Sequence, residues 1–264
     1  SMTEFHQAAA AVYLASGIAA LLGIVLPSER IARASLYGLV VGAALQGIAF
    51  ATLHRAAAPP ALTDWVSVGA LVAWMAVVVM VFFAWRMRLT TLAAVVGFVA
   101  FLFVFASLLK DPSTSVAVPG EAGAWPHAHV LLASAGISLL GVAGLAGIFY
   151  LIEHRRLKSK RALKRRVPGP SLEALDRVGV ASLAAGFPLL TLGLATGMMW
   201  QRSENGVLFA GGPHEVWTLV AWLFYAGVVF VRFRGQQGAR QGAATAVAGF
   251  VFLTFAVVGV GVLR

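Results

Sequence analysis

The sequence has no cysteine and few charged residues. The absence of cysteine among its 264 residues excludes disulfide bonds, thiolate metal sites and a cysteine nucleophile. Charged residues make up 11% of the chain, against about 25% in soluble domains, whereas hydrophobic residues make up 60%. This composition predicts an integral membrane protein, so the net charge of +10 is not read as evidence for a nucleic-acid partner.

Catalytic motifs and intramembrane charges are also missing. The sequence contains no Ser-His-Asp arrangement, Walker A loop, HExxH motif or Rossmann fingerprint. No Asp, Glu, Lys or Arg lies near the centre of any long apolar segment, which argues against an ion-coupled transporter because transport pathways usually contain such residues. No enzyme class follows from the sequence, and a small-molecule transporter or channel stays an alternative.

Eight apolar segments are long enough to cross a bilayer. A helix of roughly 20 residues spans about 30 Å of hydrocarbon, and in lipid the backbone polar groups must be satisfied within each segment. The segments are residues 7–26, 36–54, 65–85, 89–109, 128–152, 178–200, 216–231 and 242–263. We therefore predict an all-α membrane protein, a bundle of eight transmembrane helices that forms a single integral-membrane domain over residues 1–264.

Glycine and serine residues predict how two of these helices pack and begin. Several glycines in the segments 128–152 and 178–200 would let helix backbones approach closely. They are Gly136, Gly141, Gly144, Gly147, Gly193 and Gly197. Ser171 is predicted to cap the helix that contains residues 178–200.

Positive charges lie mainly between alternate spans. Sixteen of the 20 Lys and Arg residues follow the first, third, fifth or seventh span, and nine of these lie from Arg155 to Arg177. Because cytoplasmic loops carry an excess of Lys and Arg, we predict that these loops are cytoplasmic and that both termini are outside (N-out and C-out). The basic run 154–166 is interpreted as a stop-transfer signal in contact with anionic membrane lipid.

Histidines and tryptophans gather on the predicted outer side. Five of the six histidines lie there: His6, His54, His127, His129 and His214. Four tryptophans accompany them: Trp65, Trp125, Trp200 and Trp217. Tryptophan is common at membrane interfaces, and His6 and His127 are interpreted as solvated or hydrogen-bonded residues. His54 and His129 differ because each lies at the end of a predicted helix.

Two imidazoles from different helices can bind a heme iron axially. His54 and His129 are the first candidates, the four tryptophans could form flat walls, and Arg55, Lys110 or Arg202 could pair with heme propionates. Zinc would require three or four converging ligands, which His54, His129, His214 and Glu215 could supply only if three loops meet. From the residues alone, heme, another metal and no cofactor all stay open.

Two long stretches resemble a known family. HVLLASAGISLLGVAGLAGIFYLIEHRRLKSK, residues 129–160, and SLEALDRVGVASLAAGFPLLTLGLATGMMW, residues 171–200, resemble HemX/YpjD-like members of the cytochrome c assembly (CcsA/CcmC) superfamily. The resemblance implies a heme-handling protein of cytochrome c biogenesis or tetrapyrrole metabolism in a bacterial cytoplasmic (inner) membrane. It also implies heme b as the ligand and cytochrome c maturation or tetrapyrrole-synthesis proteins as partners.

The superfamily's tryptophan-rich outer segment, roughly WGxxWxWDxxE, is degenerate in this chain. Gly197 and Trp200 match its lead-in, and Glu215 and Trp217 match its end, whereas residues 205–212 depart from it. His214 stands where the family commonly has lysine.

His129 matches the first of two outer histidines that flank this segment in the family, and the resemblance implies that it is a heme ligand. The second would follow the last span, where the sequence reads GVGVLR. The other axial ligand would then be His54 or His214, unless the iron is five-coordinate. The loop 110–126 could close over such a site. An alternative is a non-catalytic membrane regulator or scaffold that has lost heme presentation and acts through its basic cytoplasmic loop, Arg155–Arg166.

Overall fold

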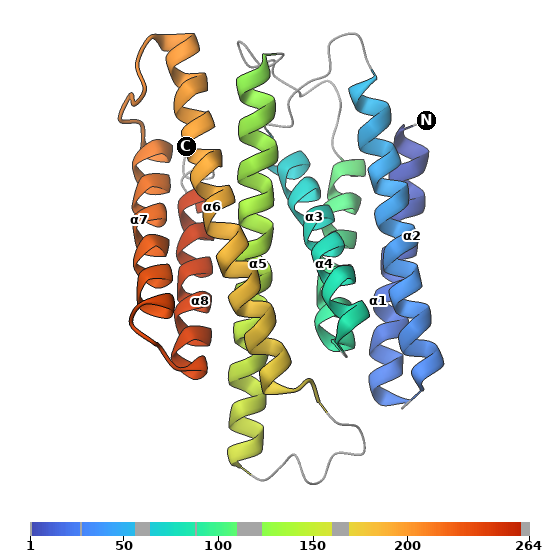
Figure 1. Cartoon of the computed structure of the whole chain (residues 1–264). Helices are drawn as coiled ribbons and strands as arrows, with labels where there is room; N and C mark the ends of the chain where they lie inside the picture. The colour runs from blue at the N-terminus through green and yellow to red at the C-terminus, as the bar shows by residue number, and fades with distance from the viewer. Residues whose placement is uncertain are drawn as a thin grey trace. The chain divides into compact units, whose positions relative to one another are not determined.

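The computed structural model describes residues 2–26, 28–55, 64–87, 89–109, 123–159 and 169–259, which contain helices and no strand. The helices are α1 (Met2–Val25), α2 (Glu29–His54), α3 (Trp65–Arg86), α4 (Thr90–Leu109), α5 (Ala124–Lys158), α6 (Leu172–Asn205), α7 (Pro213–Phe233) and α8 (Ala239–Thr254), the last followed by a π-helical turn, Phe255–Gly259 (Figure 1). All eight α-helices are long and apolar enough to cross a membrane. The predicted all-α fold with eight spans is confirmed, while the sides of the termini stay a prediction.

Local signals in the sequence determine where the longest helices begin and end. The side chain of Ser171 accepts a hydrogen bond from the amide of Ala174 at 3.1 Å, so the predicted cap of α6 is confirmed. The helix ends before Gly206, whose φ of 74° is the left-handed conformation that glycine adopts readily. With 35 and 34 residues, α5 and α6 extend beyond the apolar segments predicted for them.

The helices form two compact units. The first unit, Ser1–Val118 with Arg161–Pro170, contains α1–α4, and the second, Pro119–Lys160 with Ser171–Arg264, contains α5–α8. The single integral-membrane domain expected over residues 1–264 stays a prediction.

Hydrogen bonds between side chains and backbone join the helices of the first unit. The Tyr13 hydroxyl donates to Gln46 at 2.8 Å, and the Gln46 amide donates to the Ala70 carbonyl at 3.1 Å, which connects α1, α2 and α3. The Trp74 indole donates to the Ala43 carbonyl at 2.8 Å. Both Tyr13 and Gln46 are fully buried. Partners of this kind are required because an unsatisfied polar group in an apolar interior is costly.

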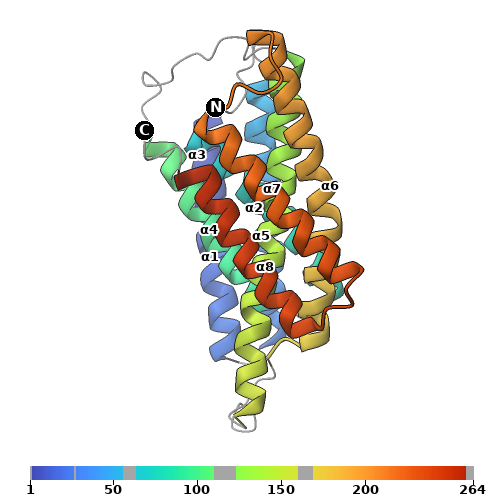
Figure 2. The same ribbon diagram turned by 90° about the vertical axis from the view of Figure 1, so that its left-hand side faces the viewer.

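Close backbone contacts join α5 to α6 and α8 in the second unit. A Cβ atom on Gly136 would lie 2.6 Å from the Leu190 amide nitrogen, and one on Gly193 would lie 2.7 Å from Cα of Ala133. A Cβ on Gly147 would similarly approach the Ala243 carbonyl of α8. The prediction that these glycines permit close helix approach is confirmed. Figure 2 shows α7 and α8 side by side. Aromatic side chains of the two helices are in contact, with the rings of Phe224 and Phe252 stacked at 5.7 Å.

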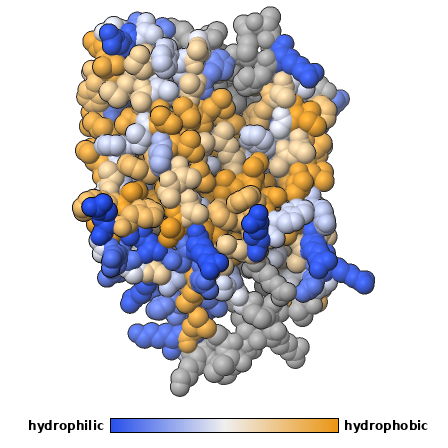
Figure 3. Space-filling view, in the orientation of Figure 1, coloured by the Kyte–Doolittle hydropathy of each residue, from blue (hydrophilic) through white to orange (hydrophobic). Residues whose placement is uncertain are grey.

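The surfaces of both units are apolar along the middle of their helices. Large hydrophobic side chains are exposed there, among them Val41 in the first unit and Leu223 in the second. On the face drawn in Figure 3, hydrophobic residues cover the middle of the helices and hydrophilic residues collect toward their ends. This distribution suits helices that contact lipid along their length and water at their ends.

Candidate functional site

His129 lies in the second turn of α5, and its ring is held by α6. The Nδ1 atom of His129 is 2.7 Å from the carbonyl oxygen of Gly193, which lies 64 residues later in the chain. A carbonyl only accepts hydrogen bonds, so Nδ1 must carry the proton that it donates. In the neutral ring the lone pair is then on Nε2, the atom available to a metal. The fold therefore fixes which nitrogen of His129 can act as a ligand.

Two glycines of α6 make room for this ring. A Cβ atom on Gly197 would lie 2.8 Å from Nδ1 and 2.9 Å from Cε1 of His129, so any larger residue would displace the imidazole. Gly193, one turn earlier, brings its carbonyl within reach because α6 approaches α5 closely there. The Thr196 hydroxyl donates to the same carbonyl at 2.9 Å. Gly197, which matches the lead-in of the family's tryptophan-rich segment, thus leaves the space that the His129 ring occupies.

Of the four tryptophans, Trp200 is the one whose contact with a candidate ligand the structure records. Its ring centroid lies 6.1 Å from that of His129, with the ring planes inclined by 49°. Trp125 is 41% exposed and lies four residues before His129, on the same face of α5. Trp217 packs against Phe252 and Phe255, with centroids 6.3 and 5.8 Å away, and so joins α7 to the end of α8.

Glu215 shapes the loop before α7. Its Oε2 atom accepts hydrogen bonds from the amides of Ala210 and Gly211 at 2.8 and 3.0 Å. Gly211 has a φ of 78°, which lets the backbone turn both amides toward the carboxylate. His214 is exposed in the first turn of α7. Over the part of the chain that the structure describes, no three His, Cys, Asp or Glu side chains converge as a metal site would require.

The candidate heme-binding residues of the first unit lie at the ends of its helices. His54 is the last residue of α2 and Trp65 the first of α3, and their side chains lie outside the described part of the structure. Arg55 follows α2 and is exposed. In the second unit, Arg202 is exposed in the last turn of α6. Lys110 and the rest of the loop up to residue 122 lie outside the described residues.

His6 is more buried than its position in the sequence suggested. Its side chain is 8% exposed, packs edge-on against Phe50 at 5.8 Å, and has an Nδ1 atom without a hydrogen-bond partner within the described residues. The interpretation of His6 as a solvated or hydrogen-bonded residue is therefore wrong for this nitrogen. A signal was present, because His6 lies two helical turns before the buried Tyr13 and so shares its face of α1.

His127 is half-buried, and one of its ring nitrogens is held within its own helix. Its Nδ1 atom lies 2.8 Å from the Gly123 carbonyl, one turn earlier in the chain. This agrees with the interpretation of a hydrogen-bonded residue and sets His127 apart from His129, whose ring is held by a second helix.

Comparison with known proteins identifies the family. Residues 62–264 match the family described as cytochrome c assembly protein, which is more than half of the chain. This chain is a member of the cytochrome c assembly family. The match includes α3–α8 with His129, Trp200 and Trp217, whereas α1 and α2, with His6 and His54, precede it.

Three relatives to which the chain is similar are each named cytochrome c biogenesis protein CcsA. The chain is 26% identical to the cytochrome c biogenesis protein CcsA of Guillardia theta over 202 residues, which are 69% of this chain and 67% of that protein. It is 40% identical to CcsA of Prochlorococcus marinus subsp. pastoris over 92 residues, 34% of this chain and 29% of that protein. CcsA of Trichormus variabilis is 37% identical over 92 residues, 34% of this chain and 26% of that protein. The chain thus aligns with less than a third of the length of these last two relatives. The predicted membership of the cytochrome c assembly superfamily is confirmed.

Proposed function

We propose that this member of the cytochrome c assembly family binds heme b through His129 and serves cytochrome c biogenesis. One observation carries the proposal: the Gly193 carbonyl holds Nδ1 of His129, which leaves Nε2 as the only ring nitrogen able to bind iron. The names of the relatives support the pathway, since each is a cytochrome c biogenesis protein.

The residues around His129 fit a heme ligand. A neutral imidazole whose second nitrogen is held by a carbonyl is the usual protein arrangement for a metal-binding histidine. The Trp200 ring at 6.1 Å offers an apolar aromatic surface beside it. When bound, heme would supply an iron atom, and His129 would hold it through Nε2.

The remaining ligands and contacts are proposed from the sequence. His54 is the first choice for the second axial position and His214 the second, and a five-coordinate iron is the remaining possibility. Arg55 and Arg202 would pair with the propionates, and Trp65, Trp125 and Trp217 would add aromatic surface. His214 and Arg202 are exposed, so both are accessible to a ligand.

We further propose that the chain is of the HemX/YpjD-like type, with a degenerate tryptophan-rich segment. In the loop that replaces the tryptophans, Val207, Leu208 and Phe209 are 41–46% exposed. The loop therefore keeps an apolar surface with less aromatic area. The protein would act in a bacterial inner membrane with both termini outside, which places His129 on the outer face.

Heme titration of the purified full-length chain tests this function. The wild type is expected to give a saturable Soret band, and His129→Ala is expected to lose it. The matched control is His127→Ala, which removes an imidazole two residues earlier on the same helix and should titrate like the wild type. His54→Ala and His214→Ala would identify the second ligand through a change of the α and β bands.

Two results would overturn the proposal. A wild type without a saturable spectral change would exclude heme binding, and a His129→Ala variant that titrates normally would exclude this ligand. With either result, the function would be sought in the basic residues at the end of α5, where Arg155, Arg156 and Lys158 are exposed. Neutralising Arg155–Arg166 would then be expected to abolish binding of a partner on the cytoplasmic side.

A further inference from the structure

The predicted cytoplasmic end of the second unit carries more basic than acidic residues. Over residues 153–159, 169–177 and 232–242, the chain has seven Lys and Arg residues and three acidic residues. Every one of these acids pairs with an arginine: Glu153 with Arg156 at 3.8 Å, Glu173 with Arg177 at 2.5 Å, and Asp176 with Arg232 at 2.7 Å. Within the described part of the chain, the basic residues left without an acidic partner are Arg155, Lys158, Arg234 and Arg240. This end therefore presents positive charge that the protein does not neutralise itself.

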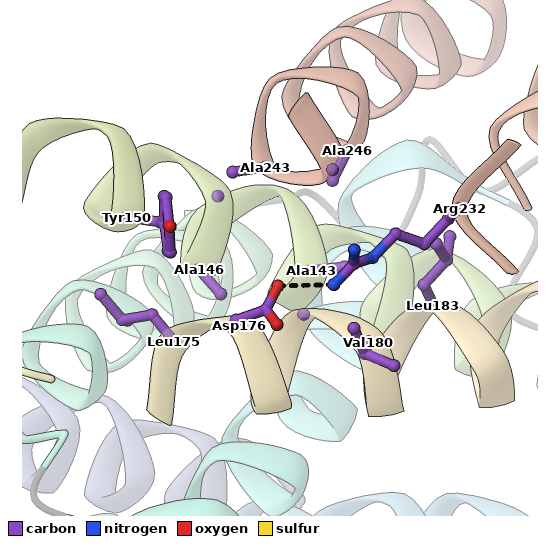
Figure 4. Close-up of a pocket in the computed structure, with 13 residues that line it drawn as sticks. Ala143, Ala146, Tyr150, Leu175, Asp176, Val180, Leu183, Arg232, Ala243 and Ala246 are labelled. Atoms are coloured by element: carbon purple, nitrogen blue, oxygen red, sulfur yellow. Dashed lines mark hydrogen bonds and ion pairs between the residues drawn. The ribbon is translucent and has the colours of Figure 1, made fainter. Parts of the chain in front are cut away.

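The ion pair of Asp176 and Arg232 orders the turn between α7 and α8. Arg232 donates from one terminal nitrogen to Oδ1 of Asp176, the contact drawn as a dashed line in Figure 4, and from the other to the Gln237 carbonyl in the turn. The Gln237 side chain accepts a hydrogen bond from the Thr245 hydroxyl of α8 at 3.3 Å. The cavity beside the ion pair has a volume of about 20 Å³, which is room for about one water. A larger ligand must therefore bind on the outside of this end.

Arg234 and Arg240 lie on either side of the ordered turn. Arg234 directly follows α7, Arg240 is in the first turn of α8, and both are exposed. With 21 residues, α7 is about 32 Å long, which matches a hydrocarbon layer of about 30 Å. A residue directly after α7 is therefore expected at the depth of the lipid headgroups. Phe230 and Phe233, just before Arg234, are 65% and 45% exposed, so apolar side chains adjoin this cation.

The basic residues of α5 lie farther from the middle of the unit. The glycine contacts show that α5 and α8 are antiparallel, and Gly147 meets the carbonyl of Ala243. From this contact, Arg155 is eight residues farther along α5, about 12 Å, whereas Arg240 is three residues away along α8, about 4.5 Å in the same direction. Figure 1 likewise shows α5 extending past the turn between α7 and α8. The turn is thus closer to the headgroup layer than the end of α5 is.

We propose that Arg234 and Arg240 bind the phosphate of an anionic phospholipid in the predicted cytoplasmic leaflet. A guanidinium presents several N–H donors that match phosphate oxygens, and basic residues beside a membrane-spanning helix attract anionic lipid. The acyl chains would contact Phe230 and Phe233. Lipid is favoured over an acidic protein because these apolar side chains adjoin the cations on a helix that is long and apolar enough to cross a membrane. The sequence predicted lipid contact only for the separate run 154–166, and the proposal does not depend on heme binding.

Native mass spectrometry of the delipidated full-length protein in detergent measures the binding. The wild type is expected to retain phosphatidylglycerol at least about tenfold more tightly than phosphatidylcholine with the same acyl chains. The double variant Arg234→Gln/Arg240→Gln should lose at least about tenfold in phosphatidylglycerol affinity and bind phosphatidylcholine as the wild type does. Soluble glycerol phosphate at equal concentration should not compete, because it lacks the acyl chains.

A matched control removes the same charge from the same end. Arg155→Gln/Lys158→Gln should change phosphatidylglycerol affinity by less than about twofold, because the attraction of a basic residue for the lipid falls off within a Debye length. Both double variants replace exposed side chains, so both proteins are expected to fold.

Four outcomes would overturn the proposal. Equal retention of the two lipids by the wild type would refute the anionic-lipid assignment and needs no variant. Undiminished phosphatidylglycerol binding by Arg234→Gln/Arg240→Gln would place the lipid elsewhere. Equal losses in the two double variants would show that binding follows the overall charge of this end and not the turn. Full competition by glycerol phosphate would show that the ligand is a soluble phosphate ester and not a membrane lipid.

Discussion

The two units of this protein differ in the contacts that hold their helices together. In the first unit, buried polar side chains join the helices, as in the chain of hydrogen bonds from Tyr13 through Gln46 to the Ala70 carbonyl. In the second unit, α5 and α6 touch backbone to backbone at glycines such as Gly136 and Gly193. Lipid provides no hydrophobic driving force between helices, so both kinds of contact are needed in a membrane.

The difference bears on function because the glycine contacts leave an imidazole nitrogen available. Gln46 and Tyr13 satisfy each other and present nothing to a ligand. His129 uses only Nδ1 for the contact between α5 and α6, and the glycines beneath its ring set its position. The same close packing that holds the second unit together thus sets the position and tautomer of the ligand that we propose.

The largest effect is expected from Gly136→Val. Its Cβ would lie 2.6 Å from the Leu190 amide nitrogen and 2.9 Å from Leu190 Cα, and backbone atoms cannot move aside as a flexible side chain can. We expect a loss of about 3 kcal/mol in unfolding free energy, at the upper end of overpacking costs, measured by denaturation in detergent. Gly179→Ala is the control and should be neutral or stabilising, since its Cβ meets open space. Wild-type stability of Gly136→Val would contradict the glycine packing described for the second unit.

Gln46→Leu should cost somewhat less in the first unit. It removes two hydrogen bonds and leaves the Tyr13 hydroxyl buried without its acceptor, so we expect a loss of about 2 kcal/mol. A double-mutant cycle with Tyr13→Phe isolates the pair and should give a coupling of about 0.6–1.7 kcal/mol. Additive effects of the two substitutions would show that the hydrogen bond contributes nothing.

Glu215→Ala should loosen a loop without unfolding either unit. The substitution removes the carboxylate that accepts from the amides of Ala210 and Gly211, and hydrogen bonds to a charged group are worth about 1.5–3 kcal/mol. Hydrogen exchange at these two amides should accelerate about tenfold or more, since about 1.4 kcal/mol corresponds to that factor. Glu204→Ala, an exposed residue in the last turn of α6, is the control and should leave both rates unchanged.

The smallest effect is expected from Trp74→Phe. It removes the single hydrogen bond from the indole to the Ala43 carbonyl while keeping most of the aromatic ring, so the expected loss is about 0.6 kcal/mol. A loss as large as that of Gln46→Leu would mean that Trp74 matters chiefly through packing against Phe50, whose ring lies 5.8 Å away.

The helices and their close contacts could be predicted from the sequence because they depend on short stretches of residues. Runs of apolar residues predicted the eight helices, Ser171 predicted the start of α6, and glycines predicted the close contacts of α5. The contact between His129 and Gly193 could not be predicted from the sequence. It joins residues 64 positions apart and depends on how α5 and α6 are rotated about their own axes. The family resemblance pointed to His129, but the tautomer became apparent only from the packed structure.

The part played by Glu215 was missed for a related reason. In the sequence, His214 and Glu215 formed a pair suited to binding a metal, whereas the structure directs the carboxylate to backbone amides five and four residues earlier. A carboxylate in the first turn of a helix, three residues after Gly212, was a signal for a loop contact of this kind. His6 was likewise placed at the surface because its burial results from packing between α1 and α2.

Chemical rescue tests the central claim most directly. His129→Gly removes the imidazole and leaves a space above Gly197 in which free imidazole can bind. If His129 is the iron ligand, this variant should lose the saturable Soret band, and added imidazole should restore it, whereas His127→Gly should need no rescue. A His129→Gly protein that keeps the wild-type heme spectrum without imidazole would contradict the account.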